Sequence, residues 1–178
     1  TVTLTGASNT IGGMASTTFP NLSIDNGSAY TMNNDNTCSS LTFVASATAS
    51  SLTQANGTTL TVNGAVTLNQ PTANFITAWN INAATATVSG LISFPANNNG
   101  GTRVAKILTT TGTLNANGGI TFSGTGTAAS SRVIDMSTGG GTGTLNLKGA
   151  LTFTAVGTLT AGTSGSTFNY ADNAAQTI

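Results

Sequence analysis

The sequence predicts an all-β chain that folds as a parallel β-solenoid, and three observations support this. Apolar and small polar residues alternate with a period of two, a ten-residue unit recurs, and charged residues are scarce. Period-two alternation is typical of strands with one buried face. A unit this small cannot enclose a core alone, so neighbouring units must stack and share one. The alternative architecture is an antiparallel β-sandwich with strand exchange between subunits.

Alternating runs mark the expected strands. No stretch shows the spacing of an amphipathic helix. Steps such as Asn-Gly, Gly-Gly and Asp-Asn-Gly separate the runs, because these residues tolerate tight turns. The clearest runs are residues 1–5, 21–24, 60–62, 65–68, 120–122 and 145–147.

A repeated unit favours the solenoid. Each copy reads as a strand, a glycine and a second strand that ends in Leu or Phe, and successive copies begin 26, 28 and 31 residues apart. The pair Asn63-Gly64 would suit a hairpin turn, but the other copies replace this pair and keep the pattern of a bend between two strands that face one interior. We therefore expect one domain over residues 1–178 with six to eight coils. The copies are residues 59–68, 85–94, 113–122 and 144–153, with Gly64, Gly90, Gly118 and Gly149 at the bends.

The charge content excludes several function classes. The chain has four Lys and Arg residues, four acidic residues, no His and one Cys. So few cations argue against nucleic-acid binding, and without His neither a Ser-His-Asp triad nor a Cys-His pair can form. We expect no metal and no cofactor, and Cys38 is predicted to be a buried small apolar residue.

The same composition indicates a location outside the cell. Thr, Asn, Gly, Ser and Ala replace the Lys and Glu that keep cytoplasmic surfaces soluble. In stacked coils, columns of Thr or Asn can form hydrogen bonds, whereas columns of like charges would repel. No apolar run is long enough for a membrane-spanning helix. We expect a secreted or cell-surface protein.

The two ends of the sequence resemble each other. Residues 1–11 match residues 167–178 with one residue of offset, so the chain ends on the kind of element with which it begins. This predicts head-to-tail contact between copies, as periods of a longer array or as separate subunits. An uncharged edge strand is a hazard for a monomer and suits a polymer. The predicted contact residues are Val2, Leu4, Phe168 and Tyr170.

Four motifs carry a family resemblance. They are TVTLTGxxNTI at the start, TTFPNLSIDNG at residues 17–27, TLTVNGAVTL at 59–68 and STFNYADNAAQTI at the end. The chain resembles the repeat segments of very large secreted bacterial surface proteins, namely filamentous adhesins and related autotransporter-like or type IX-exported proteins. The resemblance implies a β-solenoid on the cell surface that acts in adhesion, matrix or filament formation without catalysis. The regular Asp of calcium-binding nonapeptide arrays is missing, so calcium dependence is not implied.

Two carbohydrate-related functions are alternatives to this hypothesis. A carbohydrate-binding adhesin module, with surface glycans as partners, could use Tyr30, Trp79 and Tyr170 as a stacking patch, although core packing is the simpler interpretation of Trp79. A polysaccharide-degrading β-helix enzyme would need two carboxylates a few ångströms apart. The candidates for that pair, Asp25, Asp35, Asp135 and Asp172, are not neighbours in the sequence, and we expect no enzyme.

The sequence also contains features related to ice binding and to N-glycosylation. Recurrent Thr-x-Thr pairs suggest an ice-binding face, but such a face needs a constant coil period, and spacings of 26, 28 and 31 residues argue against it. Asn21, Asn26 and Asn56 each begin an Asn-x-Ser/Thr acceptor sequence for N-glycosylation.

Overall fold

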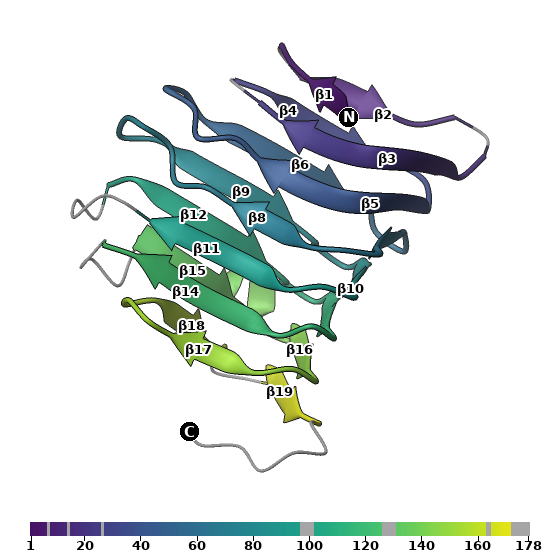
Figure 1. Cartoon of the computed structure of the whole chain (residues 1–178). Coiled ribbons are helices and arrows are strands. Elements are labelled where there is room, and N and C mark those ends of the chain that lie inside the picture. The colour runs from purple at the N-terminus through teal and green to yellow at the C-terminus, as the bar shows by residue number, and fades with distance from the viewer. Residues whose placement is uncertain are drawn as a thin grey trace.

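The chain forms a parallel β-solenoid with three faces. The computed structural model describes residues 1–6, 8–13, 15–25, 27–96, 102–125, 131–162 and 165–171. All pairings between the described strands are parallel (Figure 1). Hairpins would give antiparallel pairs, so the structure confirms the solenoid and rules out the sandwich. Among the described residues, no helix is long and apolar enough to cross a membrane.

Each coil contributes one strand to each face, in the order face II, face I, face III. Faces I and II belong to one bent sheet, because β3 (Thr17–Ile24) and β5 (Asn36–Phe43) run around the corner between them. Face I also contains β1 (Val2–Leu4), β8 (Val66–Leu68), β11 (Ile92–Ala96), β14 (Ile120–Gly124) and β17 (Leu151–Phe153).

The other two faces follow the same succession of coils. Face III is a seven-stranded sheet, which confirms the prediction of six to eight coils for the described part of the chain. Besides the first halves of β3 and β5, face II contains β7 (Thr59–Val62), β10 (Thr85–Val88), β13 (Thr113–Ala116), β16 (Thr144–Leu147) and β19 (Thr167–Tyr170). Face III contains β2 (Asn9–Ile11), β4 (Ala29–Met32), β6 (Ser50–Gln54), β9 (Ile76–Asn80), β12 (Val104–Leu108), β15 (Arg132–Asp135) and β18 (Thr158–Thr160).

The sequence repeat gives the register of the coils residue by residue. Thr85 lies beside Thr59 on one side and beside Thr113 on the other, and Thr144 follows in the same column. Phe94, Phe122 and Phe153 are likewise neighbours on face I. The unequal spacings of the copies are therefore taken up in the connections to and from face III, and faces I and II stay in register.

The core consists of columns of similar side chains that run along the solenoid. Tyr30, Leu52 and Trp79 occupy successive positions in one column, and all three are buried. The Trp79 indole Nε1 donates a hydrogen bond of 3.1 Å to Oε1 of buried Gln54, whose Nε2 donates to the Thr85 carbonyl at 2.9 Å. Trp79 is thus a core residue, because its only polar atom has a partner inside.

The repeated glycines lie at the corner between faces II and I. A Cβ on Gly90 would lie 2.6 Å from the carbonyl carbon of Gly64, and one on Gly118 would lie 2.3 Å from that of Gly90. None of these three glycines has a positive φ. The corner therefore needs glycine because the backbones of successive coils approach closely, and left-handed conformation plays no part.

We predict that Gly90→Ala destabilises the solenoid. The added methyl group would meet the backbone of Gly64 and Ala65, which connects β7 to β8 in the preceding coil and cannot move away without separating the coils. Overpacking of this kind costs about 1–3 kcal/mol, and about 2–4 °C of melting temperature per kcal/mol is typical at this length.

Thermal melting followed by circular dichroism measures this effect. Gly13→Ala is the matched control, because a Cβ there has no neighbour within 4 Å. Equal melting temperatures for the two variants would contradict the close-approach explanation.

Candidate functional site

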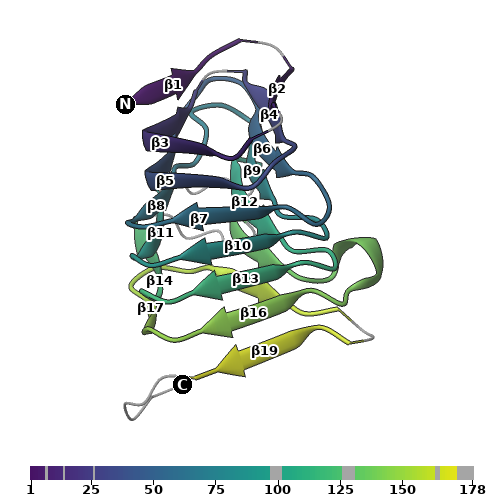
Figure 2. The ribbon, with the colours of Figure 1, turned by 90° about the vertical axis from the view of Figure 1, so that its right-hand side faces the viewer.

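The described solenoid presents open strand edges at both ends. β1 pairs only with β3 and β2 only with β4, while β17, β18 and β19 each pair on one side only with the preceding coil. Figure 2 shows β1 and β2 at one end of the stack and β19 at the other. Unpaired N–H and C=O groups along such an edge are a template for a further strand.

A column of aromatic rings ends at the surface. Phe94 and Phe122 are fully buried and stack with ring centroids 4.9 Å apart, and Phe122 stacks on Phe153 at 5.0 Å. Phe153 is the last ring of this column among the described residues and is 51% exposed. Stacked rings bury a large apolar area, so the outer side of Phe153 is an unfilled contact position.

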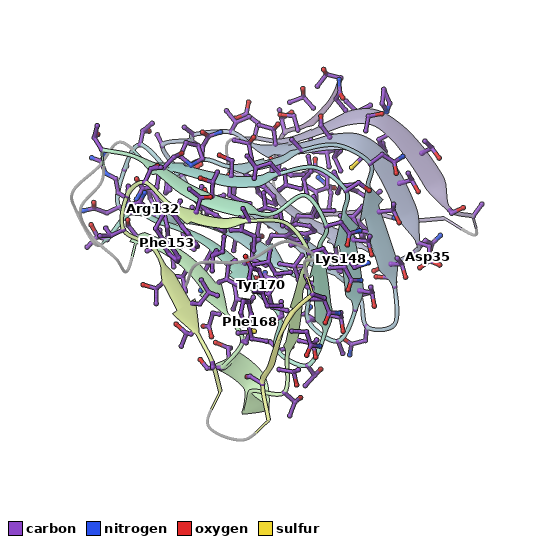
Figure 3. All side chains as sticks on the ribbon, turned by 60° about the horizontal axis from the view of Figure 1, so that its bottom comes forward. Asp35, Arg132, Lys148, Phe153, Phe168 and Tyr170 are labelled. Carbon is purple, nitrogen blue, oxygen red and sulfur yellow. The ribbon has the colours of Figure 1, made fainter. Side chains whose placement is uncertain are left out.

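A second aromatic pair lies at the same end. Phe168 on β19 is 42% exposed, and its ring stacks on Tyr170 with centroids 6.0 Å apart. Figure 3, which brings this end forward, shows Phe153, Phe168 and Tyr170 there. The C-terminal end is therefore an apolar surface as well as a set of open edges.

The opposite end also carries apolar side chains. Val2, Leu4, Ile11 and Phe19 are partly buried and pack on the core. The four contact residues predicted from the sequence thus lie at the ends of the described solenoid, with Val2 and Leu4 at one end and Phe168 and Tyr170 at the other.

The similarity between residues 1–11 and 167–178 does not correspond to equivalent positions. β1 lies on face I beside the second half of β3, whereas β19 lies on face II beside β16. Residues 172–178 lie outside the described residues. Both faces use the same period-two pattern, so sequence similarity could not distinguish them. The idea that the chain ends on the element with which it begins is wrong for these two strands.

The acidic residues that the structure describes do not form a metal-binding cluster. Among the described residues, no group of three or more His, Cys, Asp or Glu side chains could hold a metal ion. Asp35 Oδ1 accepts a hydrogen bond of 2.7 Å from the Thr59 amide, and Asp135 accepts bonds from Ser137 and Thr138 in its own turn. Asp172 lies outside the described residues. The observed contacts of Asp35 and Asp135 are those of residues that cap the backbone.

Asp135, the last residue of β15, has a carboxyl group with a lowered pKa. Burial of Asp135 by itself raises the pKa of the carboxyl group, but hydrogen bonds from the amides and hydroxyls of Ser137 and Thr138 outweigh burial and lower the pKa below its ordinary value. A group with a depressed pKa in the folded state stabilises the fold above the pKa of the unfolded chain, and that stability is lost as the pH falls through the folded pKa.

We predict that Asp135→Asn reduces the acid sensitivity of the fold. The amide keeps one acceptor and carries no charge, so the variant should be about 1 kcal/mol less stable at neutral pH. Between pH ~4 and pH ~2 the wild type should lose more stability than the variant, because only the wild type has this carboxylate to protonate. Urea unfolding at several pH values in this range measures how the free energy of unfolding of each protein changes with pH. An identical pH dependence of the wild type and the variant would contradict the assignment.

Cys38 and Arg132 are fully buried titratable residues. Cys38 is fully buried, as predicted, and burial raises its pKa to about 11, so the thiol stays protonated at neutral pH. Arg132 is also fully buried, and burial lowers its pKa. One guanidinium nitrogen of Arg132 donates to the Ser123 carbonyl at 2.7 Å. Sequence reasoning missed this burial, because Arg is expected at a surface.

The proposed sugar-stacking residues are not brought together. Tyr30 is buried, with its hydroxyl donating to the Thr5 carbonyl at 2.9 Å, and Trp79 is in the core. Tyr170 lies on β19, at the far end of the stack from Tyr30. These three residues therefore do not make one carbohydrate platform.

Two of the predicted glycosylation sites lie on the described surface. Asn21 is exposed on β3, where its Oδ1 accepts a hydrogen bond of 2.9 Å from the Ser40 hydroxyl. Asn56 is exposed in the turn before β7. Asn26 lies outside the described residues.

Comparisons with known proteins add no relative. No family model, no curated protein and no solved structure matches the chain. The geometry of the ends and faces is therefore the basis for assigning a function.

Proposed function

We propose that the chain is a structural segment of an extracellular filament or surface adhesin, and that copies of it stack head to tail into a continuous solenoid. The observation that carries the proposal is the complementarity of the two described ends. The family resemblance, the neutral composition and the hydroxyl-rich surface support the extracellular setting.

The two ends are complementary in the order of their strands. Along the chain, a strand on face II is followed by one on face I and one on face III. At the C-terminal end, β19 on face II lies one layer beyond β17 and β18. At the N-terminal end, β1 on face I and β2 on face III lie one layer beyond β3. One copy's β19 and the next copy's β1 and β2 together make one complete coil.

The side chains at this joint continue the core columns. The column of Leu4 and Ile24 is the column that ends with Phe153, so Leu4 of the next copy would cover the exposed ring. Phe19, at the other side of the joint, belongs to the column that ends with Tyr170. In this joint Leu4 meets Phe153, and Tyr170 meets Phe19. The contact residues predicted from the sequence therefore do not pair with each other.

Electrostatics and packing both favour such a joint. None of β1, β2, β17, β18 and β19 contains a charged residue. Pairing satisfies open backbone groups on three faces at once, and covering apolar surface contributes about 25 cal/mol per Å². The interface is heterologous and does not close on itself, so it produces a filament.

We predict that Phe153→Lys prevents assembly and leaves the single unit folded. A lysine in the joint would have to be buried without a partner, which costs several kcal/mol, so the polymer fraction should fall about a hundredfold or more. Leu91→Lys is the matched control, because Leu91 is 43% exposed in the connection before β11, in the middle of the stack.

Electron microscopy and sedimentation of the purified chains measure assembly, and circular dichroism confirms folding. Rods formed by the wild type and by Leu91→Lys, with single particles for Phe153→Lys, are the expected result. Rods of Phe153→Lys as long as those of the wild type would contradict the proposal, as would a wild type that stays monomeric at millimolar concentration.

Cross-linking tests the register of the joint. Neighbouring parallel strands lie ~4.8 Å apart, which suits the Cα separation of a disulfide. The pair Leu4→Cys and Phe153→Cys should therefore form disulfides between copies under mild oxidation. Leu4→Cys with Tyr170→Cys should not, because β1 and β19 lie on different faces. Mass spectrometry of the linked peptides identifies the partners, and the opposite preference would refute this register.

A further inference from the structure

Face II carries two outward columns of hydroxyl and amide groups. One column consists of threonines in register on five successive strands, and the second lies two residues further along the same strands. The first column is Thr59, Thr85, Thr113, Thr144 and Thr167, and the second is Thr61, Thr87, Asn115, Asn146 and Asn169.

These columns form a regular two-dimensional lattice. Successive strands of a parallel sheet are ~4.8 Å apart, and alternate residues of one strand are ~6.6 Å apart. The copies of the repeat begin 26, 28 and 31 residues apart in the sequence, but the ladders keep the threonines side by side. The objection that unequal coil lengths destroy the lattice is therefore wrong, because the extra residues lie in the connections to face III.

The side chains of the lattice are held in fixed orientations. Thr is β-branched and has restricted rotamers in a strand, so each presents its hydroxyl and methyl group in a repeated way. Asn115 donates to Thr87 Oγ1 at 3.1 Å, Asn146 donates to Asn115 at 2.8 Å, and Asn169 donates to Asn146 at 2.7 Å. These bonds link the side chains of successive strands along the second column.

The lattice is neutral, open and without aromatic residues. The strands β7, β10, β13 and β16 contain no charged residue and no aromatic side chain, and Figure 2 shows their ribbons side by side on one face. A single small ligand is normally held in a concave pocket by converging groups. A periodic, uncharged array of donors and acceptors instead matches a ligand that is itself periodic.

We infer that face II binds the ordered water of an ice surface. Hydroxyl groups both donate and accept hydrogen bonds, as lattice water does, and the rigid rows order several waters at once. Face I is a natural comparison within the same molecule. Its hydroxyl column runs through Thr67, Ser93 and Thr121, but Pro95 interrupts the next column along the strands, beside Ser123, so face I has no second continuous row of hydrogen-bonding side chains. This inference does not depend on head-to-tail assembly.

The test uses the full chain carrying Phe153→Lys, so that polymer formation and ice binding are measured separately. Partition of the labelled protein into a slowly growing ice hemisphere and the shape of single ice crystals are the readouts. The double variant Thr85→Lys, Thr113→Lys disrupts face II, and Thr67→Lys, Thr121→Lys is its matched control on face I. Thr113→Tyr breaks the flatness of face II with a neutral strand-forming residue, which guards against misfolding of the lysine variant.

The parent protein and the face I variant should enter ice and facet the crystals. Both face II variants should show at least a tenfold smaller fraction in ice, with unchanged circular dichroism spectra. Exclusion of the parent protein from ice would overturn the inference, and so would equal ice binding by the face I and face II variants. Binding to crystalline cellulose or chitin powder without any effect on ice would also overturn it.

Discussion

The structure depends on the parallel, in-register stacking of one coil on the next at the spacing of a β-sheet. Every other feature follows from that spacing. A side chain has its own counterpart as a neighbour at ~4.8 Å on each side, so any property of one position is repeated along a column. Columns of Leu, Ile and Phe build the core, and columns of Thr and Asn build the surface. Columns of like charge would be repulsive, which explains a chain with only 4% charged residues.

The same spacing explains why each copy of the repeat has a glycine at the corner between faces II and I. Where faces II and I meet, the backbone of each coil lies so close to the next that a methyl group has no room at Gly64, Gly90 or Gly118. β5 turns the same corner without glycine, as one continuous strand that pairs with β7 before the bend and with β8 after it. The glycines at this corner are therefore required by the close packing of successive coils more than by the conformation of one tight turn.

Stacking has no natural end, and this links the fold to the proposed function. A described coil at either end satisfies only half of its backbone groups, and the aromatic column on face I reaches the surface at Phe153. A monomeric protein would be expected to blunt such edges with charges, proline or bulges. Here the end strands are neutral. β19 takes part in both surfaces, but its open edge and Tyr170 belong to the joint, whereas Thr167 and Asn169 continue the outward columns of face II, so a filament could keep a long lattice exposed along its side.

The sequence alone determined the fold class and the register of most coils. Alternation predicted strands, and the gapless alignment of the four ten-residue copies gave the neighbours on faces I and II, because in a parallel solenoid equivalent residues of successive repeats lie side by side. The sequence also predicted that Cys38 is buried, and it is.

Only the tertiary structure decided which face each end strand occupies and which polar residues are buried. Faces I and II share the same alternation, so β1 and β19 look alike in sequence and still lie on different faces. Arg132 is fully buried and donates to the carbonyl of Ser123 on the preceding face I strand of its own coil, a contact between two faces that the sequence pattern does not indicate. The alignment of the copies placed the face II threonines in one column, but only the structure showed that the extra residues of the unequal repeats lie in the connections to and from face III, so that the column stays regular.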